Sequence, residues 1–286
     1  MFGFPSVLTA TLSLAALLAC GTTQAAHDAC PQAADIVRAA YPQATAPDSD
    51  GLMHVAQAHA DIEIDISDSP FRDPFAVICK RWPANPDLLL AAIPLMRDGP
   101  NRDFGHDGDL RILVLDRTTL KVLEHLQLDG LMSDDAMRIS DVSFDTARYD
   151  VAPGRRAFGL RISRTGSSRA NPFSETSLRL FDIGPKGLNM VLDGLIADRS
   201  GGQWDTNCAG EFSKGRVSLA IGDRVANGFK DLNATESYET SLSALQQGDC
   251  VETLQDRGTT AHTLTFDGRR YRIPETLRSM DRESAG

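Results

Sequence analysis

The chain has 286 residues, a formal net charge of −10 and 42% hydrophobic residues, a composition typical of a globular protein. Its acidic balance, without basic runs or interleaved aromatic residues, argues against nucleic acid and anionic membrane surfaces as partners. A chain of this length holds one large β domain or two small ones.

The N-terminal segment predicts export. Val7–Ala19 is an uncharged, nearly unbroken run of apolar and small residues. It is shorter than the roughly 20 apolar residues of a membrane-spanning helix, and it has the length of a signal-peptide core. The pattern therefore predicts a signal peptide over residues 1–26. Alternatively, Leu17–Gly21 resembles a bacterial lipobox, with a leucine where a smaller residue is usual. The leader would then be residues 1–19, and a lipid on Cys20 would be the only membrane contact. A buried N-terminal helix is the third interpretation.

Cysteine usage also favours an oxidising, exported location. Apart from Cys20, the chain has four cysteines, an even number that predicts two disulfides with three connectivities to choose from. We expect sequential pairing, Cys30 with Cys79 and Cys208 with Cys250. Each bridge would close a loop of about 40 to 50 residues and stabilise the fold by roughly 4 kcal/mol in the chain-entropy model. Zinc binding is the weaker alternative, because no C-x-x-C or C-x-x-H spacing occurs.

Residues 27–60 are predicted to form one short helix and a linker. Cys30–Tyr41 is helical in pattern, since Pro31 suits a first helical turn and Pro42 ends the helix. Pro42–Gly51 is polar. Beyond residue 61, short apolar runs with a period of two are separated by clusters of Gly, Asp, Asn and Pro, which is typical of antiparallel strands.

Residues 61–280 show internal repetition. Leu110–Asp116 is echoed by Leu178–Asp182, and the strands predicted to start at residues 88 and 156 precede them at the same offset of 68 residues. The predicted units lie near residues 88–155, 156–215 and 216–275, and the third contains an Asp-Gly hairpin signal at residues 267–268. We therefore predict an all-β, mainly antiparallel fold of tandem β-meander units, arranged like a propeller or as a sandwich or barrel. The alternative is a β-sandwich in which the repetition is chance.

Two long loops would join the first and second strands of successive units and emerge at the same edge. Residues 96–109 are acidic, whereas residues 164–177 are basic and polar. Long paired loops are what a scaffold displays for binding. In the second loop the candidate binding residues are Arg164, Ser167, Ser168, Arg169, Asn171 and Phe173. The alternative is that both loops are solvated hairpin ends.

Within the first loop, Asp103, Asp107 and Asp109 form a candidate calcium site. Alternating oxygen ligands around a glycine let the chain wrap a hard cation. The segment resembles the calcium-binding Asp-x-Asp-x-Asp-Gly elements of integrin-type propeller repeats, although Gly105 and Val114 stand where that pattern has ligands. A favoured Asp-Gly turn is the alternative explanation, and no other cofactor is indicated.

Trp204 lies four residues before Cys208. One interpretation is an aromatic contact for a sugar or a protein partner, held rigid by the disulfide. The other is a tryptophan packed against the disulfide in the core.

No motif assigns a reaction. Neither G-x-S-x-G nor S-x-x-K occurs, and no catalytic residue is predicted. In layout, with a signal, paired cysteines and tandem β units, the chain resembles uncharacterised periplasmic and lipoprotein families of Gram-negative bacteria. Some exported β proteins of this kind inhibit lysozymes or act as immunity proteins. The resemblance implies a non-enzymatic binding protein of the periplasm or outer membrane that engages an envelope protein or glycan through its loops. The alternatives are a secreted hydrolase acting on an envelope polymer and a structural outer-membrane lipoprotein.

Overall fold

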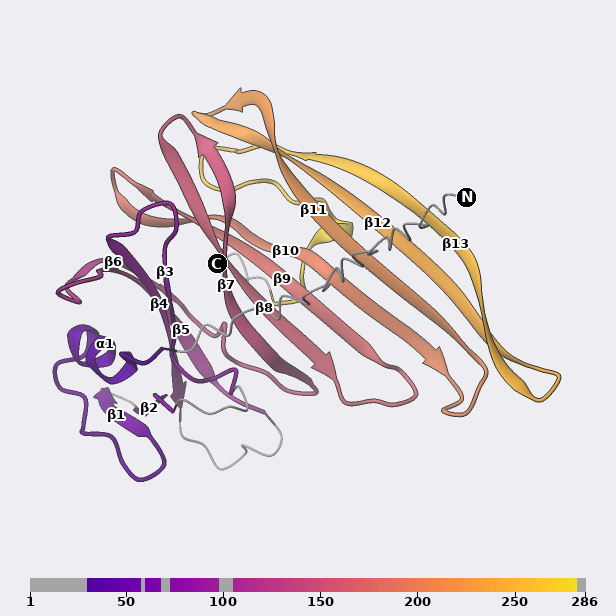
Figure 1. Cartoon of the computed structure of the whole chain (residues 1–286), viewed down its shortest axis with the longest axis horizontal. Helices are drawn as coiled ribbons and strands as arrows, with labels where there is room; N and C mark the ends of the chain where they lie inside the picture. The colour runs from indigo at the N-terminus through magenta and orange to yellow at the C-terminus, as the bar shows by residue number, and fades with distance from the viewer. Residues whose placement is uncertain (1–29, 58–59, 68–72, 98–104, 282–286) are drawn as a thin grey trace, which may run out of the picture.

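The computed structural model describes residues 30–57, 60–67, 73–97 and 105–281. This part of the chain is mainly antiparallel β-structure in two sheets, which confirms the predicted fold class (Figure 1). Among these residues, no helix is both long and apolar enough to cross a bilayer. The sheets pack as a sandwich, so the propeller and closed-barrel arrangements are wrong.

The first sheet has six strands in the order β1-β2-β4-β5-β6, with β3 pairing on β4. One short helix, α1, precedes it, as the sequence predicts. The bounds are α1 Ala33–Ala40, β1 Leu52–Gln57, β2 Ala60–Asp65, β3 Ile78–Arg81, β4 Leu88–Arg97, β5 Gly108–Asp116 and β6 Val122–Leu128.

The second sheet is a seven-stranded meander from β7 to β13, each strand pairing with its neighbours in sequence. Its strands are long, and β10 to β13 extend well beyond the first sheet (Figure 1). The bounds are β7 Met137–Ala152, β8 Arg155–Gly166, β9 Phe173–Gly184, β10 Gly187–Trp204, β11 Gly210–Ala226, β12 Phe229–Gln246 and β13 Asp249–Leu264.

The β4-β5-β6 and β8-β9-β10 meanders begin at the two positions where the repetition places them. They belong to different sheets, however, and β7 to β13 form one continuous sheet rather than separate blades. The predicted unit boundaries at residues 155 and 215 therefore fall inside strands β8 and β11. The repeat boundaries themselves stay a prediction.

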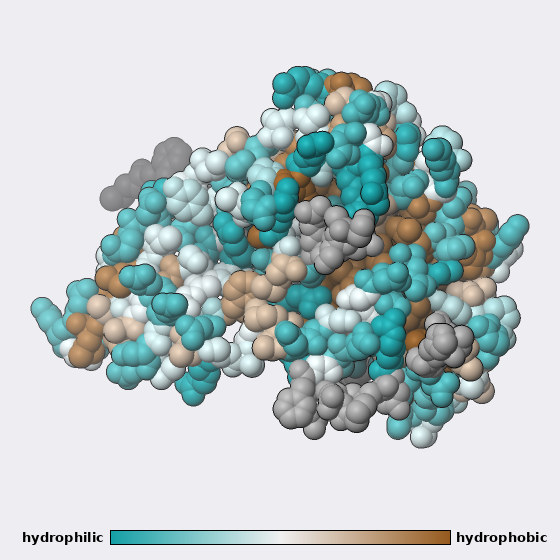
Figure 2. Space-filling view, turned by 180° about the vertical axis from the view of Figure 1, so that it is seen from behind, coloured by the Kyte–Doolittle hydropathy of each residue, from teal (hydrophilic) through white to brown (hydrophobic). Residues whose placement is uncertain are grey.

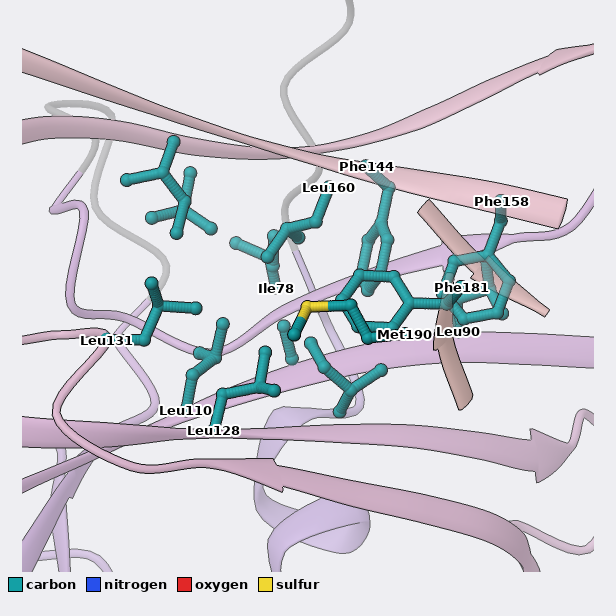
Figure 3. Close-up of a cluster of buried hydrophobic side chains, with 14 of the residues drawn as sticks. Ile78, Leu90, Leu110, Leu128, Leu131, Phe144, Phe158, Leu160, Phe181 and Met190 are labelled. Carbon is teal, nitrogen blue, oxygen red and sulfur yellow. The ribbon is translucent and has the colours of Figure 1, made fainter. Parts of the chain in front are cut away.

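Strand β4 shows why some of the strands are apolar on both of their faces. Leu89 and Ala91 pack with α1 on one side of the first sheet, while Leu90 and Ala92 face the second sheet. Successive side chains of a strand point to opposite faces, so a strand between two layers must be apolar throughout. The core between the sheets is rich in aromatic side chains, and the Phe158 ring lies 5.5 Å from that of Phe181 (Figure 3).

A separate hydrophobic cluster packs on the second sheet, away from the core between the sheets. Phe229 and Leu232 of β12 pack there with Leu178 and Leu180 of β9. The C-terminal segment joins this cluster through Tyr271, and it contains the short 3-10 helix η1, Glu275–Leu277. Arg278 forms an isolated bridge with Leu195 of β10. The C-terminal segment is therefore part of the packed fold.

Candidate functional site

The predicted pairing of the cysteines is confirmed. Cys30 is joined to Cys79, which ties the start of α1 to β3, and Cys208 is joined to Cys250 at the far end of the second sheet. Two disulfides are characteristic of an oxidising, exported compartment.

The β8–β9 connection is shorter than the sequence predicts. Pairing continues to Thr165 and Ser174, so only residues 167–172 join the two strands. Arg164 is consequently a strand residue and is buried at 7% exposure. Its guanidinium donates to the carbonyl oxygens of Ser133 (3.1 Å) and Leu131 (3.2 Å). Arg164 thus holds the junction with the β6–β7 connection instead of facing solvent.

The turn at residues 167–172 and Trp204 come together, although they are distant in sequence. The backbone N–H of Trp204 donates to the carbonyl of Ala170 (2.9 Å), and its indole N–H donates to the carbonyl of Arg169. Trp204 is half-buried, and its ring lies 6.2 Å from that of Phe212 on β11. It packs on this turn and on β11.

The remaining candidate residues of this turn are exposed or half-buried. Ser167, Ser168, Arg169 and Asn171 are exposed, and Phe173 at the start of β9 is half-buried. The hydroxyl of Ser168 accepts a hydrogen bond from the backbone N–H of Asn171 (3.1 Å). These side chains border the end of the second sheet.

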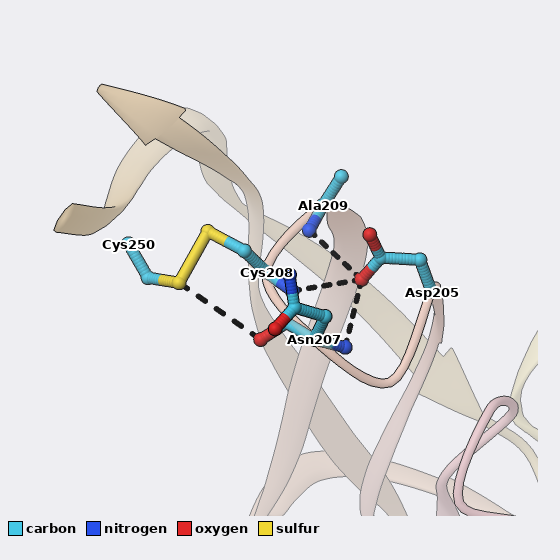
Figure 4. Close-up of a disulfide and its surroundings, with 5 residues drawn as sticks. All are labelled: Asp205, Asn207, Cys208, Ala209 and Cys250. Carbon is cyan, nitrogen blue, oxygen red and sulfur yellow. Dashed lines mark hydrogen bonds between the residues drawn. A yellow bond between two sulfur atoms is a disulfide. The ribbon is translucent and has the colours of Figure 1, made fainter. Parts of the chain in front are cut away.

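The Cys208–Cys250 bridge fastens the next connection to the β12–β13 hairpin (Figure 4). Asp205 organises the turn, because one carboxylate oxygen accepts the backbone N–H groups of Asn207 (2.9 Å), Cys208 (2.7 Å) and Ala209 (3.0 Å). These hydrogen bonds lower the pKa of Asp205. The disulfide and these hydrogen bonds therefore hold the 205–209 connection between β10 and β11 in a fixed conformation.

The candidate calcium residues are only partly described. Asp103 lies outside the described residues, and the carboxylates of Asp107 and Asp109 are held by Arg97 at 2.9 Å and 2.5 Å. Asp109 is buried and also accepts the N–H of Gly130 (2.7 Å). Within the described segments, no three His, Cys, Asp or Glu residues are grouped so that they could hold a metal ion. The described part of this loop serves to join β5 to the β6–β7 connection.

His106 and Ser133 lie near each other but do not form a nucleophile and base. The imidazole Nδ1 of His106 is 2.7 Å from the buried carboxylate of Asp134, and its ring packs at a tilt against that of Phe75. The hydroxyl of Ser133 donates instead to Asp107 (3.0 Å). In the part of the chain that the structure describes, no Ser–His hydrogen bond of a catalytic triad is present.

A groove of about 780 Å³ crosses β9 to β13, and it was not among the sequence predictions. Two parallel rows of side chains form its walls, each row running from strand to strand through paired residues. One wall consists of Thr176, Asp198, Arg216, Ser237 and Thr259, and the other of Ser174, Ser200, Lys214, Glu239 and Arg257.

The floor of the groove is backbone. Arg199, Gly215, Tyr238 and Gly258 form the row between the walls, and alternation along a strand points their side chains away from the groove. A Cβ on Gly258 would lie 2.6 Å from the Tyr238 hydroxyl, which shows that the tyrosine covers this glycine on the opposite face. The groove is thus open and shallow, with polar walls.

Aromatic side chains border the groove at the end of the sheet. Phe212 is on the same face of β11 as Lys214, two residues away. Its ring lies over Gly202, where a Cβ would approach the ring to 2.6 Å. Phe212 and Trp204 therefore lie beside the Lys214 wall, between it and the 167–172 turn.

Beyond the aromatic pair, the β12–β13 hairpin protrudes and carries exposed apolar side chains. Hydrophilic residues dominate the surface of the long strands, with brown patches near the protruding end (Figure 2). The exposed apolar residues on this hairpin are Leu242 (38%), Leu245 (64%), Val251 (37%) and Leu254 (49%).

The signal for the groove is present in the sequence. Charged and hydroxyl residues alternate at positions 214 and 216, 237 and 239, and 257 and 259, as expected for strands with one solvated face. Their place in one groove follows only from the pairing registers of four pairs of neighbouring strands, which the sequence does not specify. Comparison with protein-family models, with curated proteins and with solved structures gives no significant match.

Proposed function

We propose that this protein is an exported, non-enzymatic binding protein of the bacterial envelope, located in the periplasm or at the outer membrane, and that it holds a glycan in the β9–β13 groove. The observation that carries the proposal is the lining of the groove: its 14 residues include no aliphatic side chain. Protein interfaces and pockets for drug-like molecules rely on apolar cores, which this groove does not offer.

The lining suits a hydroxylated polymer. Five hydroxyl side chains on the two walls can donate and accept hydrogen bonds, as sugar hydroxyls do. Phe212 and Trp204 at the border offer the amphipathic aromatic surface that packs on the apolar face of a sugar ring. The groove reaches the edge strand β13, where a chain could continue past the sheet.

The proposal is tested by affinity electrophoresis of residues 27–286 in gels that contain either solubilised peptidoglycan, dextran or polygalacturonate. We expect at least one glycan to retard the protein, and Ser237→Leu in the groove wall to weaken retardation at least tenfold. Ser218→Leu is the matched control, because both serines are exposed and each donates only to a neighbouring carbonyl. Absence of retardation by all three glycans, or equal loss in both variants, would contradict the proposal.

A protein partner is the second candidate, favoured by the four exposed apolar side chains of the β12–β13 hairpin. Solvent-exposed leucines on a protruding hairpin are typical of segments that insert into a partner. The inhibitor and immunity roles belong to this candidate. Leu245→Ser with Leu254→Ser would abolish capture of an envelope protein while leaving glycan retardation unchanged. The lipoprotein alternative depends on Cys20, which lies outside the described residues.

A further inference from the structure

The charges of the groove differ from those of the whole chain. The protein has a net charge of −10, yet the groove lining contains four cations, Lys214, Arg216, Arg257 and Arg199, the last with its side chain on the opposite face, and two anions, Asp198 and Glu239. A local excess of positive charge on an acidic protein concentrates anionic ligands at that surface.

Two of the four cations are already neutralised within the chain. Arg216 pairs with Asp198 at 2.8 Å, and Arg199 pairs with Glu236 at 2.6 Å on the opposite face. Arg199 also donates to the carbonyl oxygen of Thr276 (3.2 Å). These two arginines therefore have intramolecular partners and contribute little free positive charge.

The charged side chains of the Lys214 wall form no ion pair among the described residues. Lys214, Glu239 and Arg257 form one cross-strand row on β11, β12 and β13, and all three side chains are exposed. Among the described residues none of the three has an ion-pair partner within 4.0 Å, although Glu239 stands between the two cations. Because neighbouring strands lie about 4.8 Å apart, the backbones of Lys214 and Arg257 are roughly 10 Å apart.

We infer that the ligand is an acidic glycan whose carboxylates are bound by Lys214 and Arg257, an inference that rests on the proposed function. A neutral glycan would cover both cations without supplying an anionic partner, which costs binding energy. Carboxylates give charge-assisted hydrogen bonds, which are the strong ones. Glu239 selects for spaced charges, because it repels an anion placed between the two cations.

The same charges disfavour a denser polyanion such as nucleic acid or a sulfated glycan. The net charge of −10 repels a long, highly charged chain, and Tyr238, the aromatic residue of the lining, turns its ring to the opposite face, where bases in the groove could not stack on it. A carboxylated glycan combines lower charge density with the hydroxyl groups that the serines and threonines of the walls can bind.

The test uses isothermal titration of residues 27–286 with polygalacturonate oligomers and with the same oligomers fully methyl-esterified, which removes the charge and keeps the backbone. We expect the acidic form to bind at least tenfold more tightly at low salt. Lys214→Ala and Arg257→Ala should each weaken binding about three- to tenfold. Glu239→Gln should strengthen it about two- to fivefold, since it removes a repulsive charge.

Lys186→Ala is the matched control. It removes one positive charge from the exposed β9–β10 turn, outside the groove, and should leave the affinity unchanged. Equal affinity for the acidic and esterified oligomers would overturn the inference and leave the proposed function standing. Tighter binding of heparin or single-stranded DNA than of polygalacturonate would also overturn it. If neither form of the oligomer binds and the gels show no glycan retardation, the proposed function itself fails.

Discussion

Removing the carboxylate of Asp281 should destabilise the protein markedly, although this residue lies at the end of the described chain. Its side chain is 3% exposed and is 3.1 Å from the guanidinium of Arg179, which is itself 1% exposed. The Ser177 hydroxyl donates to the same carboxylate at 2.9 Å, and Arg164 approaches it at 3.5 Å. Breaking a buried pair by removing one partner typically costs about 3–5 kcal/mol. We expect about 3 kcal/mol for Asp281→Ala, because Arg179 keeps its pair with Asp193.

The pH dependence of unfolding gives a second measure of the stability that the Asp281 carboxylate contributes. Burial alone would raise the pKa of Asp281, but Arg179, with Ser279 and Arg164, lowers it from 3.8 to about 2. That difference corresponds to about 2 kcal/mol of stability. Because the folded-state pKa is the lower one, this stability is present above about pH 4 and is lost as the pH falls towards 2.

Urea denaturation of residues 27–286, followed by tryptophan fluorescence at several pH values, measures both effects. The difference in unfolding free energy between wild type and Asp281→Asn should be about 2 kcal/mol at pH 6 and should shrink towards zero near pH 2. Asp35→Asn is the control, since its pair with Arg38 is exposed and should matter by less than about 0.5 kcal/mol. A difference for Asp281→Asn that matches the control, or that stays constant down to pH 2, would show that the Asp281 carboxylate does not stabilise the fold through Arg179.

Three further predictions concern the core, the disulfides and the aromatic border. Phe158→Ala should cost about 3–5 kcal/mol in urea denaturation, because the ring is fully buried against Trp82 and Phe181; a loss below about 1 kcal/mol would contradict this packing. Replacing Cys30 and Cys79 together by serine should cost roughly 4 kcal/mol, because the bridge spans 49 residues, and unchanged stability would argue against the bridge. Trp204→Phe should cost about 1 kcal/mol through the lost indole hydrogen bond, and an unaltered urea midpoint would count against that bond.

Much of the fold follows from local patterns. The alternation of apolar residues predicts antiparallel strands, and the turn at Gly268 has the positive φ of +102° that the Asp-Gly signal requires. Sequential cysteine pairing was the preferred one of three connectivities, and both bridges confirm it. The choice between sandwich and propeller could not be made, because the strands of different predicted units had no assigned neighbours. That choice depends on contacts between residues far apart in sequence, such as the shared core that holds Leu90 of β4 and Phe158 of β8, which no local pattern specifies.

The candidate site was predicted only in part. The turn with Ser167 and Arg169 and the aromatic residue Trp204 were both identified, yet their contact depends on the lengths of β9 and β10. Arg164 was misplaced because the repeat register put residues 164–177 in a loop, whereas it lies in β8 and its buried guanidinium donates to the carbonyl oxygens of Ser133 and Leu131. The groove was missed because its walls combine five strands, and each strand supplies only two unremarkable polar residues.

The most direct test of the central claim is to map glycan binding on the backbone amides by NMR, titrating isotope-labelled residues 27–286 with the polygalacturonate oligomers. We expect concentration-dependent shifts centred on Ser200, Lys214, Glu239 and Arg257, with the hairpin tip at Leu245 unaffected. Shifts centred on the hairpin tip, or on the first sheet, would contradict the assignment of the groove as the binding site.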